Sequence, residues 1–75
     1  MKKPAPRPRY FTGAPDNCDV CRKPFGKVMY DASYRGQSWA CMCQLCFNKN
    51  GVGLGVGKGQ RYSMQEDGRW LKTGG

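Results

Sequence analysis

The sequence predicts a small α+β domain that is stabilised by a metal ion, and three observations lead to this expectation. The chain has 75 residues, of which 39% are hydrophobic, and an apolar core alone rarely stabilises a domain of this size. Its 11 glycines and 5 prolines disfavour long helices. Its 5 cysteines include two C-x2-C pairs, Cys18–Cys21 and Cys43–Cys46, and this spacing is typical of metal-binding turns.

The N-terminal residues 1–16 are predicted to form a basic, proline-rich, extended arm. Prolines recur at every second position from residue 4 to residue 8, which forbids helix and weakens sheet. We expect Tyr10 and Phe11 to dock the end of this arm on the domain. The domain itself is predicted to span residues 17–73. It divides into a cysteine-bearing unit at 17–50, a glycine-rich segment at 51–59 and a hairpin at 60–73.

The cysteine-bearing unit is expected to contain a hairpin between its two cysteine pairs. Residues 27–32 and 37–41 alternate as strands do, and they flank a short turn that ends in Gly36. A glycine at this position supplies the positive φ that hairpin loops tend to need. We take Phe25 and Trp39 as the best candidates for the core.

A short helix and a second hairpin are expected to follow. Residues 43–50 can form about two helical turns, which Gly51 would end. Near the C-terminus, Asp67-Gly68 is a typical hairpin turn. That turn would set Glu66 opposite Arg69, Gln65 opposite Trp70 and Met64 opposite Leu71.

The segment between these elements places glycine at every second position from Gly51 to Gly59. It matches neither a phosphate-binding P-loop nor a dinucleotide fingerprint. One interpretation is a strand-like stretch whose bare face packs on Trp39, Tyr62 or Trp70. In that case Val52, Leu54 and Val56 would fill the other side. The other interpretation is a surface of exposed amides, beside Lys58 and Arg61, that a phosphate could approach.

The cysteine spacing, C-x2-C-x21-C-x2-C, indicates a single structural zinc ion. Two residues between thiols let a tight turn present both sulfurs to one tetrahedral ion. The chain has no histidine, so cysteine must supply every soft ligand. We predict Cys18, Cys21, Cys43 and Cys46 as the ligands. Cys41 could replace Cys43, but C-x4-C is a poorer turn, and Cys41 is expected to be a small buried hydrophobe.

The order of these parts favours a treble-clef-like zinc finger. A cysteine turn comes first, a hairpin follows, and the second cysteine turn opens a short helix. There, the positive end of the helix favours thiolate. A zinc ribbon, with the second cysteine pair in a β-turn, is the alternative.

The same residues resemble a group of small uncharacterised zinc-binding proteins that are common in bacteriophages and have relatives in bacteria. The matching motifs are Cys18-x2-Cys21, Phe25-Gly26, Met29-Tyr30-Asp31, Trp39-Ala40, Cys43-x2-Cys46-Phe47, Gly51-Val52-Gly53-Leu54-Gly55 and Gly57-x-Gly59-Gln60-x-Tyr62. They cover residues 17–62, and the glycine run is the most specific of them. The resemblance implies a four-cysteine zinc domain of phage origin, and it implies no particular activity.

Composition argues against an enzyme. The chain has no histidine, five carboxylates and no nucleophile beside a recognisable base, and four thiolate ligands leave no open metal position. Asp16 and Asp19, which flank the first cysteine pair, are expected to cap turns. A small-molecule substrate is not expected. Neither is a membrane role, because no apolar run approaches the ~20 residues of a membrane span. The basic N-terminus leads into prolines, so a cytoplasmic location is expected.

The formal net charge of +8 favours polyanions as partners. We predict a module that binds nucleic acid without strong sequence specificity, because aromatic rings interleave with cations and no helix is long enough to read a major groove. The candidate contact residues are Arg9, Arg35, Lys58, Arg61, Tyr62 and Arg69. The alternative is a non-enzymatic adaptor that binds a phage or host protein through the zinc domain and the proline-rich arm.

Overall fold

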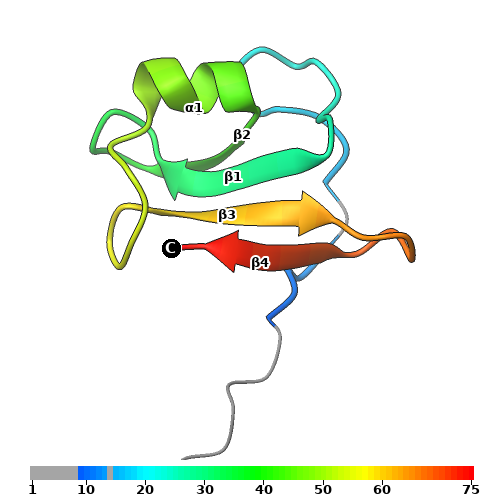
Figure 1. The fold of residues 1–75 in the computed structure, drawn as a ribbon. Helices are drawn as coiled ribbons and strands as arrows, with labels where there is room; N and C mark the ends of the chain where they lie inside the picture. Colours follow the sequence, from blue (N-terminus) through cyan, green and yellow to red (C-terminus); the bar gives the residue numbers. More distant parts are fainter. Residues whose placement is uncertain (1–8, 14) are drawn as a thin grey trace, which may run out of the picture.

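A four-stranded antiparallel sheet carries a short helix on one face in the computed structural model, which describes residues 9–13 and 15–75 (Figure 1). The elements, in chain order, are β1 (Val28–Ser33), β2 (Trp39–Met42), α1 (Gln44–Asn50), β3 (Gly59–Met64) and β4 (Trp70–Gly74). The strand order in the sheet is β2-β1-β3-β4. The predicted α+β class, the two hairpins and the single short helix are confirmed. Most of the predicted arm, residues 1–8 and 14, lies outside the described residues.

The turn between β1 and β2 is tied to the end of the helix. Arg35 and Gly36 both have positive φ, 53° and 79°, so the expected role of Gly36 is confirmed. Two hydrogen bonds to Asn50 stabilise Arg35 in this conformation. The Arg35 amide donates to the Asn50 carbonyl at 2.7 Å, and its Nε donates to Asn50 Oδ1 at 2.9 Å. Asn50 in turn donates to the carbonyl of Cys46, so the turn is coupled to the second cysteine pair.

Gly51 ends α1 as predicted, but it does so through close packing. Its φ is −73°, which any residue can adopt, and its amide donates to the carbonyl of Phe47. A Cβ at this position would lie 2.5 Å from Cδ1 of Phe47. Glycine is therefore needed because the Phe47 ring occupies the space of a side chain.

Replacing Gly51 with alanine should accordingly destabilise the zinc-loaded protein. Because the clash falls on a ring that is stacked on Tyr30, we expect a loss of about 1–3 kcal/mol. Gly26→Ala is the matched control, since a Cβ there would meet nothing within 4 Å. Denaturant unfolding of both variants measures the difference. Equal stability of the two variants would contradict the packing explanation.

The two faces of the sheet carry separate clusters of buried residues. The face covered by α1 holds Cys18, Tyr30, Ala32, Met42 and Cys46. The opposite face holds Met29, Tyr62 and Trp70, against which Phe11, Phe25 and Cys41 pack. Consecutive residues of β1 are therefore buried on opposite sides, because both faces of this strand are covered.

The prediction that Trp39 belongs to the core is wrong. Trp39 is 43% exposed, because it begins the edge strand β2 and pairs with Ser33 at the end of β1. Phe25 is partly buried and packs against both clusters, and its ring meets that of Trp70 edge to face. Trp70, only 3% exposed, is the buried tryptophan.

The C-terminal hairpin forms where it was predicted, but its predicted register is wrong by one residue. Met64 pairs with Trp70 and Ser63 with Leu71. The loop has three residues, 66–68, in which Gly68 has a φ of 85° and donates to the carbonyl of Gln65. The extra loop residue places Trp70 on the same face of the sheet as Met64, where it joins the second cluster.

The start of the described chain pairs with the free edge of β4. The Lys72 amide donates to the Arg9 carbonyl at 2.7 Å, and the Phe11 amide donates to the Trp70 carbonyl at 2.9 Å. The Phe11 ring meets Tyr62 edge to face, with 5.4 Å between the ring centroids. The expectation that Tyr10 and Phe11 dock the arm on the domain is thus confirmed.

The glycine-rich segment is not the strand-like stretch that the pattern suggested. Gly53, Gly55 and Gly57 have φ values of 123°, 125° and 76°, which turn the chain repeatedly. Its apolar residues do not fill a core. The exposed fractions are 46% for Val52, 37% for Leu54 and 100% for Val56. Where a glycine of this segment does pack closely, it meets Phe47 or Ala32 and not the predicted aromatic residues.

Candidate metal centre

Four cysteines from two distant parts of the chain converge at one point beside α1. The sulfur atoms of Cys18, Cys21, Cys43 and Cys46 all lie within 4.8 Å of one another. Those of Cys21 and Cys43 are 3.7 Å apart. Sulfurs at the corners of a tetrahedron around zinc, each ~2.3 Å from the ion, are about 3.8 Å apart. The cluster therefore has the size and the donor set of a four-thiolate metal site.

The first cysteine pair lies in a tight loop closed by backbone hydrogen bonds. The Cys18 amide donates to the Lys23 carbonyl at 2.9 Å, and the Arg22 amide donates to the Cys18 carbonyl at 3.0 Å. Arg22 takes a positive φ of 66° to complete the loop. The Val20 amide points at the Cys18 sulfur, 3.4 Å away. Amides aimed at sulfur in this way stabilise thiolate.

Asp19 joins this loop to the sheet. Its amide donates to the Cys41 carbonyl at 2.8 Å, and its carboxylate accepts from the Cys41 amide at 2.9 Å. Asp19 was expected to cap the turn of the first cysteine pair, but its carboxylate instead accepts from a strand residue of β2. The loop pairs with the outer edge of β2, and β2 leads directly into Cys43. This pairing brings the first cysteine pair to the second.

The second cysteine pair lies at the start of the helix. Cys43 is the residue before α1, and Cys46 lies in its first turn. Two contacts hold the helix on β1: the Tyr30 hydroxyl donates to Gln44 Oε1 at 2.7 Å, and its ring stacks on Phe47 with 4.0 Å between centroids. The position of the second pair therefore depends on packing against the sheet.

Cys41 is separated from the cluster. It pairs with Asp31 across the β1–β2 ladder and packs against the second buried cluster, on the other face of the sheet. Burial, together with the nearby carboxylates of Asp31 and Asp19, raises the pKa of its thiol to about 11. The expectation that Cys43 and not Cys41 belongs to the four-cysteine set is confirmed.

The four clustered thiols differ in how readily they ionise without a cation. Burial opposes ionisation of Cys18, but amides of Cys21, Cys43 and Val20 together lower its pKa to about 6. Burial raises the pKa of Cys46 to about 12, and hydrogen bonds with the neighbouring thiols act in the same direction. A metal ion would compensate the charge of all four thiolates at once.

The predicted nucleic-acid contacts come from several elements of the fold. Arg35 and Lys58 are exposed in separate turns. Arg9 is exposed beside β4, and Arg61 is half-buried and donates to both Oγ1 and the carbonyl of Thr73. Arg69 forms an ion pair with Asp67 at 2.7 Å and lies 3.9 Å above the Tyr10 ring.

Tyr62 is corrected as a contact residue. Its ring is 7% exposed in the second buried cluster, and its hydroxyl donates to Gln60 Oε1. It cannot offer a face to a base. The interleaving of aromatic and basic residues along the chain does not distinguish this buried tyrosine from the exposed aromatic residues.

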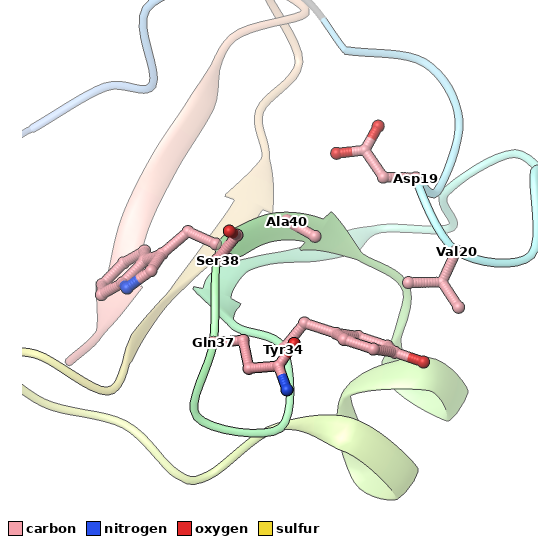
Figure 2. A pocket seen from close by; sticks show the side chains of 7 residues that line it. Asp19, Val20, Tyr34, Gln37, Ser38 and Ala40 are labelled. Atoms are coloured by element: carbon pink, nitrogen blue, oxygen red, sulfur yellow. The ribbon is translucent and has the colours of Figure 1, made fainter.

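An open groove of about 350 Å³ lies next to the first cysteine loop (Figure 2). Residue spacing and composition do not indicate this groove, because its walls come from the loop and from the β1–β2 turn. Asp19 and Val20 form one side, and Gln37 and Ser38 lie across from them. Tyr34 extends between the two sides, and Ala40 of β2 lies behind it. Trp39 completes the lining.

The described residues thus contain one cluster of metal-binding character, made of four thiols. No helix among them has the length and apolar character needed to cross a membrane. Comparison with protein-family models, curated proteins and solved structures finds no match to this chain.

Proposed function

We propose that the protein is a small zinc-binding module in which one structural zinc ion maintains the fold. The observation that carries this proposal is the convergence of four cysteine sulfurs within 4.8 Å. Soft thiolate donors in a four-membered set favour zinc among the common divalent ions. The order of cysteine loop, hairpin and helix-borne cysteine pair supports a treble-clef arrangement over a zinc ribbon.

Native mass spectrometry of the protein purified without added metal tests the identity of the ion. We expect, at each charge state, a mass increase of one zinc ion less two protons, which is the change that a divalent ion produces. Replacement by cobalt should produce the intense charge-transfer bands of a tetrahedral thiolate site. A protein that carries no metal, or that carries a different ion after purification, would contradict the zinc assignment.

We further propose that the module binds nucleic acid through its unpaired positive charge. The described residues contain ten lysines and arginines and all five carboxylates of the chain. They form a single ion pair, that of Asp67 and Arg69. Nine of the ten cations are therefore free of a carboxylate partner and able to neutralise phosphate. The seven-residue helix α1 is short for major-groove reading, which supports weak sequence specificity.

Fluorescence anisotropy of labelled DNA and RNA with the zinc-loaded protein tests this proposal. Binding should weaken about tenfold or more between roughly 50 and 200 mM salt, because counterions are released from each neutralised phosphate. Lys58→Gln should lower the salt slope by about 1 if Lys58 contacts a phosphate. Lys49→Gln removes the same charge from the exposed end of α1 and serves as the matched control. A salt slope for Lys58→Gln equal to that of the wild type would argue against a contact at Lys58.

A protein-interaction adaptor is a second candidate, and the exposed apolar side chains of the glycine-rich segment favour it. Val52, Leu54 and Val56 project from a segment rich in turns, and Val56 is fully exposed. Exposed apolar residues grouped in this way are typical of contact surfaces. Absence of nucleic-acid binding even at about 50 mM salt would favour this second candidate over the first.

A further inference from the structure

The groove beside the first cysteine loop is lined by Trp39, an aromatic side chain that belongs to neither buried cluster, and by Tyr34, which packs against the helix-side cluster. Trp39, at its rim, is 43% exposed, whereas the other tryptophan of the chain is 3% exposed. Val20 on the opposite wall is 38% exposed, and the Tyr34 ring lies between the walls (Figure 2). Leaving a tryptophan and a valine facing solvent forgoes favourable burial. Such grouping indicates a surface that is covered by a ligand.

The charges around the groove favour different positions for a base and for a phosphate. The Asp19 carboxylate lines the groove and would repel a phosphate there. The Arg35 guanidinium lies 5.4 Å from the centroid of the Tyr34 ring, so a cation borders the aromatic surface. Gln37 and Ser38 add hydrogen-bonding groups to the lining. A ligand with a flat uncharged part and an anionic part next to it suits this arrangement.

We propose that the groove binds an unpaired base of single-stranded nucleic acid. This proposal rests on the nucleic-acid binding proposed above, and it specifies the strand type and the place of contact. The base would stack against Trp39, and Arg35 would neutralise the adjacent phosphate. In a duplex the bases are already stacked on one another, so their faces are not available to the groove. The protein should therefore prefer single strands.

The test compares two labelled oligonucleotides of about 12 nucleotides, oligothymidine and a fully abasic strand of the same phosphate count. Anisotropy with the zinc-loaded full chain should show tighter binding of oligothymidine. Trp39→Ala should weaken oligothymidine binding about 5-fold or more, because base–aromatic stacking is lost. The same variant should leave abasic binding and the salt slope unchanged. Val56→Ala, which truncates a fully exposed apolar side chain outside the groove, should behave as wild type.

Intrinsic fluorescence gives a second readout that does not depend on a destabilising substitution. Stacking of a base on Trp39 should quench the emission of the wild-type protein, and Trp39→Phe should remove the quenching while retaining binding. Equal affinity of the wild type for the two strands, or an unchanged oligothymidine affinity in Trp39→Ala, would overturn the groove proposal. Salt-dependent binding would survive either result, so the proposed function would stand. No binding of either strand at about 50 mM salt would overturn both.

Discussion

Removal of zinc is expected to unfold the sheet and the helix together. Two of the five residues in the helix-side cluster, Cys18 and Cys46, belong to the four-cysteine set, so the candidate metal site forms part of the core. Metal binding to sites of this kind contributes on the order of 10 kcal/mol or more, which exceeds what a small apolar core supplies. Amide NMR spectra recorded before and after chelation measure the effect. An unchanged spectrum after chelation would contradict this role of the metal.

Two cysteine variants distinguish the effect of losing the metal from the effect of losing a thiol. Cys43→Ala removes one of the four clustered sulfurs and should prevent folding at neutral pH. Cys41→Ala removes a thiol two residues away on the opposite face and should leave zinc content at one ion per chain. Zinc content and circular dichroism of the two proteins provide the measurement. A folded, zinc-loaded Cys43→Ala protein would show that the ligand set has been assigned incorrectly.

Trp70→Ala is expected to destabilise the zinc-loaded protein by about 3–5 kcal/mol. The Trp70 side chain is 3% exposed, meets Phe25 edge to face at 5.7 Å, and donates from its indole nitrogen to the Pro15 carbonyl at 3.3 Å. Truncation would leave a cavity between the sheet and the chain that covers it. It would also remove the partner of the Pro15 carbonyl.

Trp39→Ala is the matched control, because it deletes the same side chain from an exposed position. We expect it to cost less than about 1 kcal/mol, since surface substitutions rarely cost more. Denaturant unfolding in the presence of zinc compares the two variants. If Trp39→Ala were as destabilising as Trp70→Ala, the assignment of these two tryptophans to surface and core would be wrong.

Local patterns in the sequence were sufficient to identify the four cysteines and the secondary structure around them. A C-x2-C pair forms its turn within a few residues, so its spacing alone predicts a candidate metal site. The strand and helix positions were also predictable, because each depends on a short run of alternating or turn-forming residues. The choice of Cys43 over Cys41 could be made in the same way, from the geometry of one turn.

Features that depend on long-range packing could not be predicted. The register of the C-terminal hairpin depends on one additional loop residue, and that residue decides which face Trp70 occupies. The exposure of Trp39 depends on its place at the start of an edge strand. The requirement for glycine at position 51 depends on a phenylalanine ring four residues earlier, and no rule about φ would reveal it.

The sequence by itself therefore determined the α+β class, the four thiols and the approximate position of every strand and of the helix, because these follow from interactions between near neighbours. Only the tertiary structure decided which aromatic residues are buried, how the first cysteine loop is held on β2 through Asp19, and where a groove opens. Those properties arise when segments distant in sequence meet. Their contacts are selected by the packing of the whole chain.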